Sequence, residues 1–366
     1  MSLEETINSL PIIDNHAHGV RPFTEELTPR KYAGHFTEGP PSEHARHTLY
    51  YRNAIDSLSM YFNVDTETEV VEQRSRVDFE SFAEDLFEQA NLSHILQDTG
   101  TPPESSVQRL GQYTNATVLP VLRIENEIER LIESCDNFVR FRDNLYESLL
   151  DAVTGDHIAL KSIIAYRTGL NISNPSLSEA AQAFYEVKMD WNGRIEHPVL
   201  LDYTANLATK IAGQNDIPIQ FHTGFGDKDA HPQFVDPSYM WEFMKRHDET
   251  DIVLLHASYP YTRTAGHIAS VLENVYLDIG MTIPFIQHGV VSLLRRLLEL
   301  APSTKLMYSS DGHFVPEWYY FGAERIRTDL LDALNGLIDD EFVSVDYADT
   351  IARNVLRENA ERVYSL

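Results

Sequence analysis

Short apolar runs recur along the chain, and between them lie longer segments in which apolar and polar positions follow a helical period. Eight runs are predicted strands, at residues 11–14, 93–97, 117–122, 158–164, 217–221, 252–255, 275–279 and 305–309. Helical patterns lie at residues 125–150, 178–190, 202–214, 238–248, 262–273 and 287–300. Because the strands are continuously apolar, they indicate a parallel sheet that is buried on both faces.

Repeated strand–helix units over 366 residues predict an α/β fold, a (β/α)8 TIM barrel. The alternative is a doubly wound open sheet. That fold commonly carries a glycine-rich phosphate loop after the first strand, and none follows residues 11–14. The barrel is therefore the favoured architecture.

Two segments depart from the repeat. Residues 22–91, approximately, are predicted to form a helical insertion after strand 1, with Thr66 and Thr68 as capping-type residues. After the last strand, the chain continues through extra C-terminal helices. No linker or internal repeat divides the sequence, so residues 1–366 are expected to form one barrel domain.

The composition of the chain indicates which classes of binding partner are expected. The chain has 56 acidic and 29 basic residues and a net charge of −27, which disfavours nucleic-acid binding. No run approaches the roughly 18 apolar residues of a membrane span, and the N-terminus lacks a signal-peptide pattern, so a cytoplasmic protein is expected. The one cysteine, Cys135, lies in a predicted helix and is expected to be a buried structural thiol. A small molecule is the expected partner, and homo-oligomerisation stays open.

The first predicted strand ends in two histidines, in the stretch IIDNHAH. His16 and His18 occupy alternate positions, and alternate side chains of an extended chain point to the same face. Both imidazoles can therefore converge on one ion. By itself the pattern is equally compatible with a polar turn that contains two histidines.

Further polar residues follow or occupy the later strands. Lys161 lies in strand 4, His222 follows strand 5, His256 follows strand 6 and Asp311 follows strand 8. The carboxyl ends of the strands in a barrel share one face, so these residues are expected to meet in one pocket. Imidazole and carboxylate groups are suitable ligands for Zn²⁺ and related ions, and the combination predicts a metal site.

The order of these residues resembles that of the amidohydrolase superfamily of metal-dependent barrel hydrolases. The likeness extends from IDNHAH to SSDG. The stretches IPIQFHTGFGDKD, VLLHASYPYTR, NVYLDIGMTIP and ALKSIIAYRTGL resemble more closely the amidohydrolase domain that some fungal and plant proteins carry before a glutamine-synthetase-like domain. That second domain is not expected within these 366 residues.

The resemblance implies zinc or another divalent metal, as one or two ions. In the two-ion form, which is slightly favoured, His16, His18 and Asp311 hold one ion and His222 and His256 the other, with a carboxylated Lys161 as the bridge. In the one-ion form, His16, His18, His222 and Asp311 are the ligands, and His256 is an acid or base. Asp311 is expected to take a proton from the attacking water and pass it to the leaving amine.

Substrate residues are expected at the same strand ends. Arg123 ends strand 3, and Tyr166 and Arg167 follow strand 4; the guanidinium groups would suit a substrate carboxylate, although surface ion pairs are an equal alternative. His313, Trp318 and Tyr319 follow Asp311 and are candidates either for the pocket wall or for packing.

Three functions are weighed. The leading one is hydrolysis of an amide C–N bond, for example in a γ-glutamyl amide or another carboxylate-bearing small molecule, as the resemblance implies. The second is a mononuclear-metal decarboxylase or isomerase on the same scaffold. The third is a catalytically silent barrel, which would require a broken ligand set.

Overall fold

Eight parallel strands form a single sheet that follows the order of the chain, β1 to β8. This computed structural model describes residues 2–102 and 106–366. The strands are β1 (Ile12–Ala17), β2 (Leu92–Asp98), β3 (Thr117–Arg123), β4 (Ala159–Ser162), β5 (Ile219–Phe221), β6 (Ile252–Leu254), β7 (Val275–Asp278) and β8 (Leu306–Met307). The predicted (β/α)8 barrel is confirmed, and each strand overlaps the segment predicted for it.

Backbone hydrogen bonds bring the two ends of the sheet together. The Asn15 N–H donates to Tyr308 O at 3.1 Å, and the Asp311 N–H donates to His16 O at 3.1 Å. Val20 also forms a parallel bridge with Phe314. The first strand and the segment after the last strand are therefore neighbours, which places the histidines of β1 beside Asp311.

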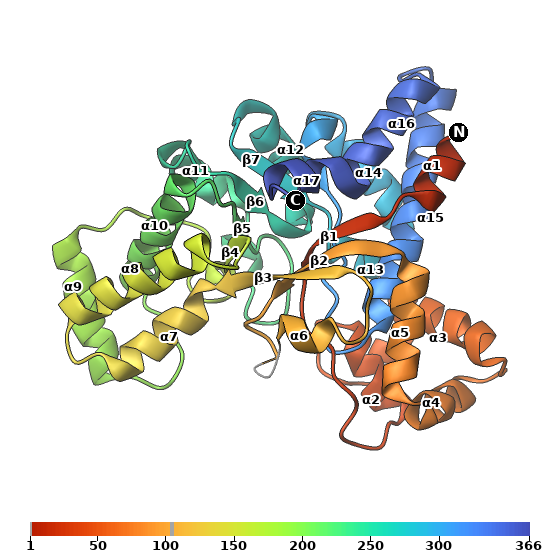
Figure 1. Ribbon diagram of the computed structural model, residues 1–366, viewed down its shortest axis with the longest axis horizontal. Helices are drawn as coiled ribbons and strands as arrows, with labels where there is room; N and C mark the ends of the chain where they lie inside the picture. The colour runs from red at the N-terminus through yellow and green to blue at the C-terminus, as the bar shows by residue number, and fades with distance from the viewer. Residues whose placement is uncertain (1, 103–105) are drawn as a thin grey trace.

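Helices cover the outside of the barrel (Figure 1). Those between the strands and near the N-terminus are α1 (Leu3–Ser9), α6 (Val107–Leu110), α7 (Ile124–Ser134), α8 (Phe138–Thr154), α9 (Leu177–Met189), α10 (Pro198–Gln214), α11 (Trp241–Arg246), α12 (Thr262–Val271), α13 (Thr282–Ile286) and α14 (Val290–Leu297). After β8 come α15 (Glu317–Asp339), α16 (Val345–Arg353) and α17 (Asn359–Val363).

The helix predicted at residues 125–150 was wrong as a single element. The structure has two helices there, because α7 ends at Ser134 and Asn137 caps the start of α8 by accepting a hydrogen bond from the Arg140 N–H. Asparagine at this position satisfies a backbone donor that a new helix would otherwise leave free. Cys135 lies in the break between the helices, and its side chain is buried.

Between β1 and β2 the chain forms α2 (Pro29–Ala33), α3 (Leu49–Phe62), α4 (Glu67–Arg76) and α5 (Phe79–Ala90), which gather beside the barrel (Figure 1). We call residues 22–91 the insertion. Thr66 is the N-cap of α4 and forms a capping box with Glu69. Asp78 caps α5 in the same way as Asn137 caps α8, so residues 67–90 form two helices, α4 and α5.

Three hydrophobic clusters stabilise these layers. One lies between the strands and the surrounding helices. The second joins the insertion to α15 and includes Tyr51, Phe82 and Trp318. The third contains inward-facing strand residues such as Ile13 and Val121, together with side chains of the C-terminal segment that fill the barrel interior.

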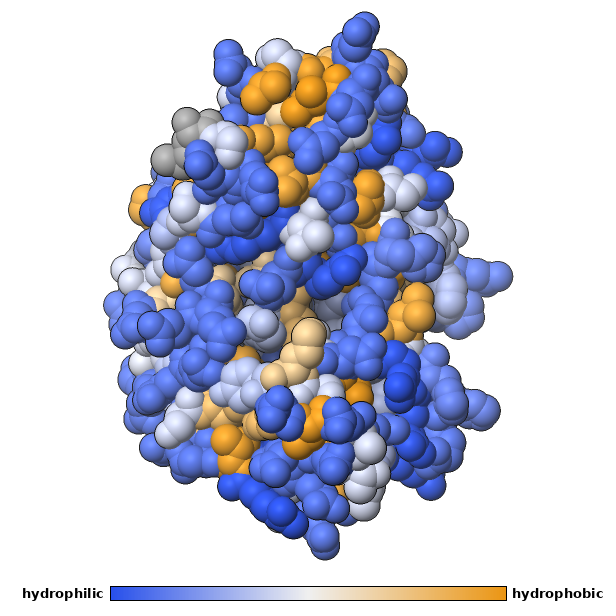
Figure 2. Space-filling view, turned by 90° about the vertical axis from the view of Figure 1, so that its right-hand side faces the viewer, coloured by the Kyte–Doolittle hydropathy of each residue, from blue (hydrophilic) through white to orange (hydrophobic). Residues whose placement is uncertain are grey.

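One face of the molecule is strongly polar (Figure 2). On the face in Figure 2, hydrophilic residues predominate and hydrophobic residues form small scattered groups. Within residues 2–102 and 106–366, no helix combines the length and the apolar character needed to cross a membrane.

Candidate metal centre

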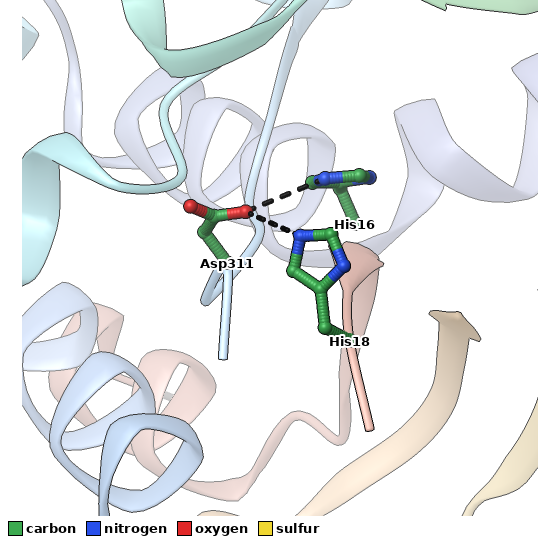
Figure 3. A group of neighbouring side chains, drawn as sticks. All are labelled: His16, His18 and Asp311. Atoms are coloured by element: carbon green, nitrogen blue, oxygen red, sulfur yellow. Dashed lines mark ion pairs between the residues drawn. The ribbon is translucent and has the colours of Figure 1, made fainter. Parts of the chain in front are cut away.

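Three side chains at the carboxyl ends of β1 and β8 converge on one point. The Nε2 atoms of His16 and His18 lie 3.3 and 3.4 Å from the same oxygen, Oδ1 of Asp311. Figure 3 shows both imidazoles directed at this oxygen, while the other carboxylate oxygen points away. One ligand atom from each residue lies within 4.8 Å of the others, as a shared metal ion requires. All three residues are buried.

The tautomer of His16 is set by Gln220 on β5. Gln220 Oε1 lies 2.8 Å from His16 Nδ1, while the Gln220 amide donates to Asn15 O at 2.7 Å. Because the carbonyl oxygen of Gln220 can only accept, His16 Nδ1 carries the proton and Nε2 presents a lone pair. Burial is the main cause that lowers the pKa of His16 to about 3. The His16 imidazole is therefore neutral and has a fixed orientation.

Removal of this orienting contact should weaken metal binding. We expect Gln220→Leu to lower zinc affinity about 10–100-fold, because the His16 ring loses the acceptor that fixes its tautomer. Competition with a chromophoric chelator measures the affinity. Gln214→Leu, at the exposed end of α10, is the control and should leave the affinity unchanged. Equal affinities for Gln220→Leu and the wild type would show that Gln220 does not support the ligand.

Asp311 lies in a strained turn that other side chains hold in place. Its φ angle of 51° is in the left-handed region, which is uncommon for residues other than glycine and often occurs at functional sites. The preceding residue, Ser310, donates to buried Asp14 from its backbone N–H at 2.9 Å and from its hydroxyl at 2.5 Å. The Gly312 N–H donates to Ser310 Oγ at 2.8 Å. These contacts aim the Asp311 carboxylate at the histidines.

Neighbouring histidines keep the Asp311 carboxylate ionised. Burial by itself would raise its pKa, but His256, His16 and His18 together hold the pKa well below its usual value. Asp14 differs, because burial raises its pKa to about 8. Asp311 is therefore the anionic member of the cluster, and Asp14 is its structural support.

Lys161 on β4 reaches the same cluster. Its Nζ lies 3.0 Å from His16 Nε2 and 3.4 Å from Asp98 Oδ2, and its side chain is buried. Burial is the main cause that lowers the pKa of this amine. Asp98, at the end of β2, also binds Arg123, with 2.7 Å between Arg123 Nη2 and Asp98 Oδ2. One buried carboxylate thus joins Lys161 to Arg123.

His222 and His256 contact each other beside this cluster, with 3.0 Å between His222 Nδ1 and His256 Nε2. The Met281 N–H donates to His256 Nδ1 at 3.4 Å, and His222 Nε2 lies 3.0 Å from Phe225 O. Only one set of tautomers satisfies all three contacts: His256 Nε2 donates to His222 Nδ1, and His222 Nε2 donates to Phe225 O. The structure therefore brings these histidines together as a hydrogen-bonded pair, separate from the His16–His18–Asp311 group.

A cavity of about 340 Å³ opens beside the cluster. Four predicted metal ligands line it: His18, Lys161, His222 and Asp311. The four residues expected to bind substrate also line it: Arg123, Tyr166, Arg167 and His313. The remaining lining residues are Glu38, Thr101, Ile163, Arg194, Asp227, Asp229, Met281 and Phe314. Three of the predicted histidine and carboxylate ligands, His18, His222 and Asp311, thus share one cavity with the arginines. Trp318 and Tyr319, the other wall candidates, are buried outside this lining; the Tyr319 hydroxyl donates to His18 O.

Four supporting residues did not emerge from the sequence: Asp98, Gln220, Asp278 and Glu38. Asp98 and Asp278 end β2 and β7, so they occupy the same kind of position as the predicted ligands. Asp278 accepts from the His256 N–H at 3.0 Å. A search for polar residues at every strand end would have found both. Glu38 lies in the insertion, where no pattern distinguishes it from other acidic residues.

The structure is a (β/α)8 barrel with a His-x-His and Asp cluster that could hold a metal ion. The amidohydrolase family model matches residues 189–366, and the resemblance to the amidohydrolase superfamily is thereby confirmed. Protein fluG of Emericella nidulans is 29% identical over 413 residues, which supports closeness to the fungal fluG-type protein. The match covers 100% of this chain and 47% of that relative, so the chain spans about half of its length.

Solved structures share the fold. A structure from Lactobacillus casei, described as that of a metal-dependent hydrolase, matches with a TM-score of 0.91 and 24% identity over 100% of this chain and 97% of that chain. A uronate isomerase from Thermotoga maritima matches with a TM-score of 0.71 and 13% identity over 99% and 96% of the two chains. At identities of 24% and 13%, these two matches show that the chains share the barrel fold.

Proposed function

We propose that this chain is a metal-dependent hydrolase that cleaves an amide C–N bond in a carboxylate-bearing small molecule, such as a γ-glutamyl amide. The observation that carries the proposal is the convergence of His16, His18 and Asp311 beside a cavity lined by arginines. Neutral imidazoles and an ionised carboxylate are the donor set that divalent ions such as Zn²⁺ prefer. The resemblance to the amidohydrolases supports the same reaction class.

The donor atoms of the site would fit up to two ions. His16, His18 and Asp311 would hold the first ion. His222 and His256 would hold a second, with Lys161 as the bridge once its amine is carboxylated by CO2. The 3.0 Å contact between His222 Nδ1 and His256 Nε2 supports a shared ion only after the proton between the two rings is lost. A bound ion would supply Lewis acidity and lower the pKa of its water.

Side chains of the protein would perform the proton transfer and the substrate binding. Asp311 Oδ2, which points away from the histidines, would accept the proton of the attacking water and deliver it to the leaving amine (Figure 3). Arg123, at the end of β3, would hold a substrate carboxylate, with Arg167 beside it on the same cavity. His256 would hold or release a proton at Nε2 in the one-ion form.

One observation favours the alternative, a mononuclear decarboxylase or isomerase. The Lys161 amine lies 3.4 Å from Asp98 Oδ2, and this buried carboxylate would attract an ammonium group but repel a carbamate. Metal analysis together with ¹³C NMR after incubation with labelled bicarbonate distinguishes the two forms. Two ions and a carbamate signal would support the hydrolase, whereas one ion and an unmodified lysine would support the alternative.

Amide cleavage should depend on the metal. We expect protein stripped with a chelator to release no amine from γ-glutamyl amides or N-acyl amino acids, and zinc or manganese to restore the activity, because the ion activates the water. Amine release measured by a coupled assay tests this. Reconstituted protein that cleaves no amide, but releases CO2 from an aromatic acid or isomerises a uronate, would contradict the hydrolase proposal.

A further inference from the structure

The insertion places a carboxylate without a partner in the cavity. Glu38 follows the short helical turn Gly34–Phe36 and lines the same cavity as His18 and Asp311. Its side chain is partly buried. Among residues 2–102 and 106–366, no hydrogen bond or ion pair reaches this carboxylate. Burial, followed by the negative charges of Asp311 and Asp227, raises the pKa of Glu38 to about 8, because an unpaired charge away from water is costly.

The other acids of the cavity differ from Glu38. Asp229 pairs with Arg194, with 3.0 Å between Asp229 Oδ2 and Arg194 Nη2. Asp227 accepts from the Asp229 N–H at 2.8 Å and is exposed. Glu38 is therefore the lining carboxylate that remains available for a cation brought by a ligand.

A guanidinium group on the same cavity also has two donor atoms without partners in the described part of the chain. The Arg167 side chain is only 9% exposed, and its Nη2 lies 3.1 Å from Glu129 Oε1. Its Nε and Nη1 atoms are buried and have no hydrogen-bond partner in the part of the chain that the structure describes. Arg123 uses Nε and Nη2 for Asp98, which leaves Nη1 for the cavity. Arginine donors and the unpaired Glu38 side chain thus line the same cavity.

We infer that the site recognises a zwitterionic substrate, with Glu38 binding an ammonium group and Arg167, together with Arg123, binding a carboxylate. This inference rests on the proposed function and deepens it, because it selects amides of acids that carry a free α-amino group over simple N-acyl or dicarboxylic amides. Glu38 is the specificity residue for the ammonium group. Since it comes from the insertion, the insertion takes part in substrate choice as well as in covering the barrel.

Equilibrium binding to the zinc-loaded full chain tests the inference without requiring turnover. Three probes separate the charges: L-glutamate carries the ammonium and both carboxylates, glutarate lacks the ammonium, and 4-aminobutyrate lacks the α-carboxylate. We expect L-glutamate to bind about tenfold or more tightly than either of the others, since each lost charge removes a charge-assisted hydrogen bond.

Single variants assign the charges to residues. Glu38→Gln should weaken L-glutamate to the level of glutarate and change glutarate less than about threefold, because only the ammonium contact is lost. Arg167→Gln should weaken L-glutamate and glutarate and leave 4-aminobutyrate nearly unchanged. Glu26→Gln, an exposed position of the insertion, is the matched control and should change none of the three affinities.

Several outcomes would overturn the inference: glutarate binding the wild type as tightly as L-glutamate, equal losses for both probes in Glu38→Gln, or no binding of L-glutamate at millimolar concentrations. If Glu38 were instead a general acid, Glu38→Gln would lose turnover but would keep the wild-type preference for L-glutamate over glutarate. Any loss of affinity would then be equal for both probes, which is the second of these results. Selective L-glutamate binding without hydrolysis of any amide would refute the proposed reaction and leave the zwitterion site standing.

Discussion

Asp311→Asn is expected to lower kcat/KM for an amide substrate about 1000-fold or more at saturating zinc. The substitution keeps the size of the side chain but removes the group that accepts the proton of water, and such groups typically contribute 10²–10⁴-fold. It also removes the negative charge that faces His16 and His18. Initial rates of amine release, together with the zinc content of each sample, measure the effect.

The matched control is Asp56→Asn, which removes the same charge from an exposed position of α3. It should retain wild-type activity and zinc content. If zinc-loaded Asp311→Asn keeps activity within about tenfold of the wild type, Asp311 does not transfer the proton, and another base of the cavity must act.

The barrel could be predicted from sequence because its signal is local and repeated. Most strands contain a short apolar run, as burial on both faces requires, and these runs alternate with longer segments of helical period. The helix boundaries were harder to predict. The pattern of α7 continues in phase into α8, so the division at Cys135 depends on the capping contact of Asn137, which residue spacing alone does not reveal.

The candidate ligands could be predicted because a parallel barrel places the carboxyl ends of all its strands on one face, so residues far apart in sequence lie close together there. His16 and Asp311 meet because β1 neighbours the segment after β8. What could not be predicted is the partner of each group. Gln220 orients His16, and Asp98 joins Lys161 to Arg123, but these contacts depend on side-chain reach inside the barrel. The same limit applies to Glu38, because an acidic insertion contains many carboxylates and only the fold shows which one faces the cavity.

The insertion is held to the barrel by a buried charge cluster. Arg74 on α4 contacts Glu317 at the start of α15, with 2.5 Å between Arg74 Nε and Glu317 Oε1, and the Tyr32 hydroxyl donates to the same oxygen at 2.7 Å. The side chains of Arg74 and Glu317 are 2% and 0% exposed. The guanidinium also lies over the Phe82 ring, 4.4 Å from its centroid. The buried charges of Arg74 and Glu317 are therefore stabilised by each other and by this aromatic packing.

Arg74→Met is expected to lower the free energy of unfolding by about 3–5 kcal/mol, because it leaves the buried Glu317 side chain without its cation. Urea denaturation at fixed ionic strength measures the loss. Arg76→Met, on the same helix, is the matched control: its side chain is 71% exposed and lies 3.5 Å from Glu72, so its loss should cost less than about 1 kcal/mol.

A double variant separates the ion pair from the packing around it. Arg74→Met combined with Glu317→Gln removes both charges and keeps an acceptor for Tyr32, so it should cost clearly less than the sum of the two single variants. Strictly additive losses would show that packing of the Arg74 stem over the aromatic rings, rather than the ion pair, holds the insertion. Because the insertion supplies Glu38, a loosened insertion should also reduce the preference for L-glutamate over glutarate while Asp311 and its histidines remain in place.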